Sequence, residues 1–95
     1  MNKIGVLGAG TMGAGIAQLF ASSGLDVVLR DIDHSLVEKG LASIEGSLGR
    51  LVARGQLEAT EKDAMTARID GTTDLNRFSG CHLIVEAIVE NMEVK

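Results

Sequence analysis

The chain has 95 residues and a net charge of −4, and 45% of its residues are hydrophobic and 23% charged. These values are typical of one small globular domain, and they argue against nucleic-acid binding, which needs a clustered basic surface. No apolar run reaches the roughly 20 residues of a membrane helix, and the first residues lack the pattern of a signal peptide, so we expect neither a nucleic-acid nor a membrane partner.

The first predicted unit is a strand, a helix and a second strand. Residues 3–7 (KIGVL) are apolar and predict the first strand. Residues 12–23 predict the helix, which ends at Gly24, a position where glycine favours φ > 0. The β-branched residues of 25–30 (LDVVLR) predict the second strand. The predicted apolar face of the helix consists of Ile16, Ala17, Leu19 and Phe20.

A long amphipathic helix follows, with Asp33 as its predicted N-cap and its end near Gly55. Thr60 and Asp63 resemble a capping box at the start of a shorter helix. The long helix carries apolar residues at steps of three and four, so that one stripe faces a core; they are Val37, Leu41, Ile44, Leu48 and Leu51. The apolar residues of the shorter helix are Met65 and Ile69.

Two further strands are predicted in the last third of the sequence. Residues 71–75 (GTTDL) form a short one, and residues 82–89 (HLIVEAIV) form an almost continuous apolar one, as expected for a strand buried on both faces of a parallel sheet. Strands that alternate with helices predict an α/β fold, a Rossmann-like doubly wound parallel sheet. Because a complete sheet of this kind has more strands, we interpret residues 1–95 as one partial domain of a longer protein.

A glycine-rich corner joins the first strand to the first helix. Gly8, Gly10 and Gly13 have the G-x-G-x-x-G spacing, and Asp31 follows about 20 residues later at the end of the second strand. The first glycine allows a tight turn, the second lets the backbone approach a pyrophosphate, and the third lets the helix pack against the strand. The helix N-terminus offers N–H groups and partial positive charge, to which Thr11 can add a hydroxyl. This context favours dinucleotide binding over a merely flexible corner.

Asp31 favours NAD among the dinucleotides, because a carboxylate accepts hydrogen bonds from the adenosine ribose and repels a 2′-phosphate. An arginine can accommodate that phosphate, but the alternation of the strand directs Arg30 away from Asp31, so we interpret it as a solvated side chain. FAD stays open as an alternative. Its proteins share the glycine pattern, although they more often carry glutamate at the acidic position.

Four stretches of the sequence resemble the amino-terminal part of 3-hydroxyacyl-CoA dehydrogenases, most of all the short-chain bacterial type that acts on 3-hydroxybutyryl-CoA. They are GVLGAGTMGAGIAQLFASSGLDVVLRDI, GLASIEGSLGRLVARGQL, GTTDL and IVEAIVENMEVK, so the resemblance covers essentially the whole chain. It implies an NAD-binding domain followed by a helical dimerisation domain. It also implies an oxidoreductase of fatty acid metabolism that interconverts L-3-hydroxyacyl-CoA and 3-ketoacyl-CoA by hydride transfer.

The resemblance implies particular NAD contacts. The ribose carboxylate is Asp31, and further contacts are Ala87, Glu90 and Lys95, near the end of the last strand, where such sheets bind ligands. Without the resemblance, Glu90 and Lys95 would be interpreted as a surface ion pair. The residues matched to the phosphate loop are Gly8, Ala9, Gly10, Thr11, Met12 and Gly13.

The resemblance also implies substrate contacts. Ser47 and Arg54 match positions that hold the CoA moiety, and without the resemblance they are the polar face of an amphipathic helix. The histidine, glutamate, serine and asparagine that act in the family's reaction fall beyond residue 95, and neither His34 nor His82 matches the histidine. We therefore assign no catalytic residue and expect the chain alone to be inactive.

The resulting hypothesis is the NAD-binding part of an acyl-CoA oxidoreductase that forms a homodimer through its C-terminal domain. Two alternatives stay open: a non-catalytic nucleotide-binding fragment, and an NAD-dependent 3-hydroxyacid dehydrogenase that acts on free acids. The single cysteine, Cys81, cannot form an internal disulfide and favours a cytoplasmic location. The histidines and the cysteine do not have metal-ligand spacing, so we expect no metal site.

Overall fold

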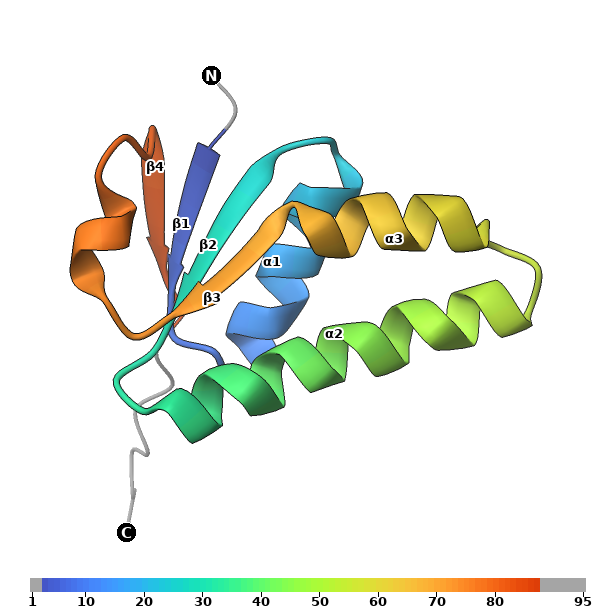
Figure 1. Ribbon diagram of the computed structural model, residues 1–95, viewed down its shortest axis with the longest axis horizontal. Coiled ribbons are helices and arrows are strands. Elements are labelled where there is room, and N and C mark those ends of the chain that lie inside the picture. The colour runs from blue at the N-terminus through green and yellow to red at the C-terminus, as the bar shows by residue number, and fades with distance from the viewer. Residues whose placement is uncertain (1–2, 88–95) are drawn as a thin grey trace, which may run out of the picture.

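A parallel four-stranded sheet organises the chain in the computed structural model, which describes residues 3–87 (Figure 1). The strand order is β3-β2-β1-β4, and all neighbouring strands are parallel. The elements in chain order are β1 (Lys3–Leu7), α1 (Thr11–Ser22), β2 (Asp26–Arg30), α2 (His34–Ala53), α3 (Ala59–Ala67), β3 (Ile69–Thr72), the 3₁₀ helix η1 (Leu75–Phe78) and β4 (Leu83–Glu86). The predicted Rossmann-like α/β architecture is confirmed.

The strand order reverses direction at β1. The chain moves outward from β1 through β2 to β3, and it then returns to the other side of β1 to form β4. In open parallel sheets the crevice at the carboxyl ends of the strands beside such a reversal is where ligands bind. This end of the sheet carries the β1–α1 turn and the β2–α2 turn.

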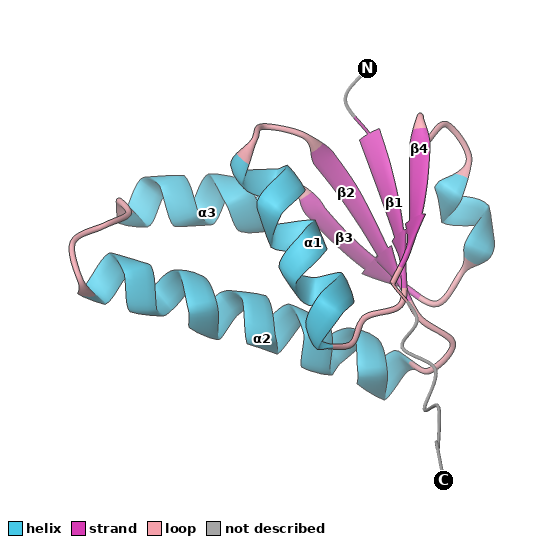
Figure 2. Cartoon of the chain, turned by 180° about the vertical axis from the view of Figure 1, so that it is seen from behind, coloured by secondary structure: helices cyan, strands magenta, loops and turns pink. Residues whose placement is uncertain are grey.

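The main core lies between the sheet and the three helices α1, α2 and α3, which cover one of its faces (Figure 2). Ile4 and Val6 of β1 and Val27 and Leu29 of β2 enter this core. The predicted apolar stripe of α2 is confirmed. Its fully buried members are Val37, Ile44 and Leu48, and Leu41 and Leu51 pack partly buried against the core.

Helix α1 lies close to the sheet because its buried residues are small. They are Gly13, Ala14, Ala17 and Ala21. The predicted apolar face was wrong in one member, since Leu19 is 64% exposed. Alanine and glycine occupy the contact positions, so the larger Leu19 lies outside them, whereas Ile16 and Phe20 are partly buried at the border of the core.

The predicted boundaries of α1 and α2 are confirmed by their caps. Gly24 and Gly55, which follow the two helices, have φ angles of 88° and 73°. The side chain of Asp33 accepts a hydrogen bond from the backbone N–H of Ser35 at 3.0 Å, which caps the start of α2. The ends of α1 and α2 and the start of α2 were therefore readable from Gly24, Gly55 and Asp33.

The start of α3 differs from the prediction. Glu58 is the N-cap, and Glu61 completes the capping box, so the pairing of Thr60 with Asp63 was wrong. The two possible capping boxes, Glu58 with Glu61 and Thr60 with Asp63, overlap in sequence, and the first of them forms. Ile69 opens β3 and does not belong to the helix.

The two last predicted strands also needed correction. Residues 71–75 do not form one strand, because β3 covers Ile69–Thr72 and Asp74 caps η1 by accepting from the N–H of Asn76 at 2.9 Å. The last strand, β4, covers Leu83–Glu86 and lies at the edge of the sheet. Its residues Leu83 and Ile84 are each 49% exposed, so the described residues do not bury both faces of this strand. Residues 88 and 89 lie outside the described part.

On the second face of the sheet, the short helix η1 packs against the central strand β1. The ring of Phe78 packs on Gly5, where a Cβ atom would lie 3.0 Å from the ring. Arg77 forms an ion pair with Asp70 of β3. Within residues 3–87, no helix is long and apolar enough to cross a membrane.

The contact of Gly13 with the β1–α1 turn predicts the effect of a single methyl group. A Cβ at this position would lie 1.6 Å from the carbonyl oxygen of Gly8. We expect Gly13→Ala to destabilise the fold by at least about 1–3 kcal/mol, the usual cost of overpacking, as measured by urea unfolding. Gly49→Ala is the control, since its Cβ would meet nothing within 4 Å and should stabilise α2 by about 0.5–1 kcal/mol. Equal stability of the two variants would contradict the packing argument.

Candidate dinucleotide-binding site

The β1–α1 turn is tied to the end of β2 by two hydrogen bonds. Gly8 has a φ of 112°, and its N–H donates to the carbonyl oxygen of Arg30 at 2.7 Å. The next residue, Ala9, donates its N–H to Oδ2 of Asp31 at 2.8 Å. The glycine corner and the acidic residue, separated by 22 positions in sequence, therefore form one connected unit.

The space above the turn is open at Gly10. This residue is the N-cap of α1, and a Cβ there would meet nothing within 4 Å. The first backbone hydrogen bond of the helix runs from the N–H of Ala14 to the carbonyl of Gly10 at 2.8 Å, so the preceding N–H groups of the first turn have no acceptor within the helix. No acidic side chain lies in that turn, and the positive end of the helix dipole is left for an anion.

Thr11 and Met12 occupy the first two positions of α1 on its exposed side. Both are exposed, and Met12 has 53% of its surface accessible. Gly13, in contrast, is buried against Gly8. The predicted phosphate loop is thus divided between residues that make the turn and residues that face solvent.

Asp31 has a carboxylate with a fixed orientation. Its Oδ2 accepts from Ala9, and its Oδ1 accepts from the N–H of Ile32 at 2.7 Å. Each carboxylate oxygen can accept a second hydrogen bond, so both retain capacity for ribose hydroxyls. Since two backbone groups already orient the side chain, little conformational entropy remains to be lost when a ligand binds.

Arg30 is directed away from Asp31, and it is not simply solvated. It is half-buried, and its Nε donates to the carbonyl oxygen of Thr73 at 3.0 Å. The interpretation as a solvated side chain was therefore incomplete, because the guanidinium joins β2 to the segment that follows β3.

Ala87 lies beside the glycine corner. It is 3% exposed, its N–H donates to the carbonyl of Leu7 at 2.8 Å, and its Cβ lies 3.6 Å from the position that a Cβ at Gly13 would take. The end of β4 and the start of α1 are thus brought together, as the predicted site requires. Glu90 and Lys95, the other two residues predicted there, lie outside the described residues.

Gly40 is a part of this unit that the sequence reasoning missed. It is buried in α2, and a Cβ there would lie 2.6 Å from the carbonyl oxygen of Ala9. The absence of a side chain lets the long helix pack directly on the β1–α1 turn. A glycine at a core-facing position of an otherwise regular amphipathic helix was the available signal.

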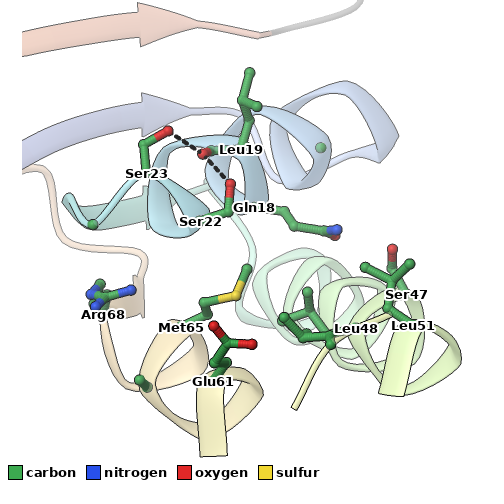
Figure 3. A pocket seen from close by; sticks show the side chains of 14 residues that line it. Gln18, Leu19, Ser22, Ser23, Ser47, Leu48, Leu51, Glu61, Met65 and Arg68 are labelled. Atoms are coloured by element: carbon green, nitrogen blue, oxygen red, sulfur yellow. Dashed lines mark hydrogen bonds between the residues drawn. The ribbon is translucent and has the colours of Figure 1, made fainter. Parts of the chain in front are cut away.

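The two predicted substrate residues lie away from the glycine corner. Ser47 lines a groove of about 780 Å³ between α1, α2 and α3 (Figure 3). Leu48, Leu51 and Met65 supply apolar walls of the groove. Arg54 is not a lining residue of the groove; it is the C-cap of α2, so the predicted pair shares the end of the helix but not the groove.

Side chains at the rim of this groove donate hydrogen bonds to backbone carbonyl groups at the C-terminal end of α1. The hydroxyl groups of Ser22 and Ser23 both donate to the carbonyl of Leu19 (Figure 3), and Nη1 of Arg68 donates to the carbonyl of Ala21 at 2.9 Å. Arg68 thereby connects α3 to α1. No group of three or more metal-ligating side chains occurs within residues 3–87.

The fold and the tied glycine corner define a Rossmann-type dinucleotide-binding domain. Residues 3–95 match the family described as the NAD-binding domain of 3-hydroxyacyl-CoA dehydrogenase, and the chain belongs to this family. The predicted family and its cofactor, NAD, are confirmed.

Named relatives of high similarity support this assignment. The chain is 48% identical over 93 residues to a "Probable 3-hydroxybutyryl-CoA dehydrogenase" of Deinococcus radiodurans, covering 98% of this chain and 33% of the relative. A crystal structure of (S)-3-hydroxybutyryl-CoA dehydrogenase from Ralstonia eutropha superposes with a TM-score of 0.92 at 41% identity, covering 96% of this chain and 32% of that one. The chain thus spans about a third of the length of these two proteins.

The two hydrogen bonds accepted by the carboxylate of Asp31 predict that replacing it with a neutral amide weakens NAD binding. We expect Asp31→Asn to weaken NAD binding about tenfold, because the amide leaves either Ala9 or Ile32 without an acceptor and removes the negative charge. The same change should reduce the preference for NAD over NADP, measured by calorimetry with both nucleotides. Asp33→Asn is the matched control, since asparagine is an equally good N-cap. Equal losses in the two variants would contradict this role of Asp31.

Proposed function

We propose that the chain binds NAD across the carboxyl ends of β1, β2 and β4. The pyrophosphate lies at the start of α1 over Gly10, and the adenosine ribose lies on Asp31. The observation that carries this proposal is the 2.8 Å hydrogen bond from Ala9 to Asp31, because it joins the phosphate loop and the ribose carboxylate into one rigid unit. The proposed loop contacts are Gly8, Ala9, Gly10, Thr11, Met12 and Gly13.

The nicotinamide half of the cofactor extends from the loop toward the end of β4. Ala87 lines that side, next to Gly13, and Glu90 and Lys95 are proposed as further contacts. The strand order supports this direction, because β4 lies on the opposite side of β1 from β2. The adenosine and nicotinamide halves then lie on opposite sides of the central strand.

The reaction that we propose belongs to a protein of about the length of the relatives. In it, a hydride passes between the C3 carbon of an L-3-hydroxyacyl-CoA and the NAD held by this chain. Ser47 and Arg54 contribute a hydroxyl and a positive charge that bind the CoA moiety. We propose no catalytic residue in this chain, which by itself is a nucleotide-binding module without turnover.

The setting of this reaction is proposed on the same basis. The protein acts in fatty acid metabolism, in the cytoplasm, as a homodimer held together by a C-terminal domain. Relatives in Bradyrhizobium diazoefficiens and Clostridioides difficile named 3-hydroxybutyryl-CoA dehydrogenase support the substrate class.

Gly10 provides a direct test of the pyrophosphate position. Its φ of −72° and ψ of −166° suit any residue, so Gly10→Ala should fold normally and place a methyl group where the phosphates approach. We expect NAD affinity to fall at least about tenfold, measured by calorimetry, with the unfolding midpoint unchanged. Gly15→Ala, in the same helix and also in open space, should retain the affinity. Unchanged NAD binding by Gly10→Ala would argue that the phosphates lie elsewhere.

Arg54 provides a test of the substrate class. In the longer protein, Arg54→Glu should raise the KM for acetoacetyl-CoA about tenfold by removing a charged contact, while the KM for NADH stays the same. Arg50→Glu is the matched control, because it changes an exposed arginine at the same helix end and alters the helix dipole interaction equally.

Two further assays decide between the candidate reactions. The isolated chain should show no turnover with acetoacetyl-CoA and NADH. If the longer protein reduces free acetoacetate as fast as its CoA ester, the alternative of a dehydrogenase for free 3-hydroxyacids is correct.

A further inference from the structure

Gly40 lies in the first half of α2, where its missing side chain leaves room for the carbonyl group of Ala9. A Cβ on Gly40 would lie 2.6 Å from that carbonyl oxygen and 3.1 Å from the Cβ of Ala9. A glycine inside a helix lowers the stability of the helix, and a close approach of another backbone is one reason for its presence. The carbonyl group of Ala9 is therefore directed at the backbone of α2.

The direction of this carbonyl group determines the direction of the next N–H. In a trans peptide, the C=O group and the N–H group that follows it point to opposite sides of one rigid plane, and residues 3–87 contain no cis peptide bond. The N–H of Gly10 therefore points away from α2. This N–H has no backbone acceptor within the described residues, and a Cβ on Gly10 would meet nothing within 4 Å.

The rest of Ala9 is held in place as well. Its N–H donates to Oδ2 of Asp31 at 2.8 Å, and its side chain is 2% exposed in the main core. The N–H of Gly8 donates to the carbonyl oxygen of Arg30 at 2.7 Å. Because the turn is tied to β2 on one side and covered by α2 on the other, Ala9 has no free direction in which to move.

We propose that Gly40 is a positioning residue for the cofactor. By receiving the carbonyl group of Ala9, it fixes the plane of the Ala9–Gly10 peptide and directs the N–H of Gly10 toward the pyrophosphate. The inference rests on the proposed function and adds a residue of α2 that acts on the phosphates through Ala9, without touching them. A hydrogen-bond donor that is oriented before the ligand arrives loses little conformational entropy on binding.

A role in packing alone would be shared by Gly71 of β3, a second glycine that α2 covers. A Cβ on Gly71 would lie 2.8 Å from side-chain atoms of both Val37 and Leu41, which lie on either side of Gly40 in α2. Gly71→Ala therefore strains the same part of the helix but does not reach the carbonyl group of Ala9. It is the matched control for Gly40→Ala.

NAD binding to the two variants tests the proposal. Both are made together with Gly49→Ala, which should stabilise α2 and offset the loss of stability. We expect Gly40→Ala to weaken NAD binding about tenfold or more in calorimetry, because the displaced carbonyl group turns the N–H of Gly10 away from a charged acceptor. Gly71→Ala should retain the affinity of the Gly49→Ala chain, although both variants lower the unfolding midpoint by overpacking.

A second measurement follows the donor itself. In the unmodified chain, the amide proton of Gly10 should move downfield in NMR spectra when NAD is added, since it then donates to a phosphate. This shift should be retained in Gly71→Ala and lost in Gly40→Ala.

The inference is overturned if NAD leaves the amide proton of Gly10 unchanged in the unmodified chain, a result that needs no variant to fold. It is also overturned if Gly40→Ala and Gly71→Ala bind NAD equally well. If the unmodified chain binds NAD and depends on Asp31 in either of these cases, this inference alone fails. If the unmodified chain binds no NAD, the proposed function fails as well.

Discussion

Two carbonyl oxygens of the β1–α1 turn, those of Gly8 and Ala9, are each covered by a glycine from a helix. Gly13 packs on the first and Gly40 on the second, at distances that no Cβ would allow. These two contacts set the depth at which α1 and α2 lie on the sheet. The small buried residues of α1 and the apolar stripe of α2 can then form one core with β1 and β2.

The β1–α1 turn takes part both in the packing of the helices and in the proposed binding of NAD. The N–H of Ala9 is bound by Asp31, its carbonyl is covered by Gly40, and the N–H groups of the next turn remain available for an anion. Because the carboxylate is oriented by the backbone before any ligand arrives, binding requires little rearrangement. The proposed contact of Asp31 with the adenosine ribose uses a carboxylate at the end of β2 that two backbone N–H groups hold in place.

The sequence predicted those features that depend on local chemistry. The caps at Gly24 and Asp33 and the glycine corner with its acidic partner were recognisable because each has a fixed spacing and a local physical cause. Features set by distant segments were missed. The exposure of Leu19 depends on how closely α1 lies to the sheet, and the roles of Gly40 and Arg68 depend on contacts with residues far away in the chain. The degree of burial of β4 could not be predicted from its sequence, because periodicity reports an apolar strand but not its neighbours.

The parallel sheet also determines the order in which the chain can fold. The central strand β1 is the first element of the described part, yet one of its neighbours, β4, is the last element of that part, and Ile4 pairs with Leu83. During synthesis, β1 therefore has an unpaired apolar edge until nearly all of these residues have left the ribosome. Such non-local pairing folds slowly and leaves strand edges open to association with other chains. The β1–β2 pair, closed by the hydrogen bonds of Gly8 and Ala9, joins segments that are much closer in sequence, so it can form before β4 is available.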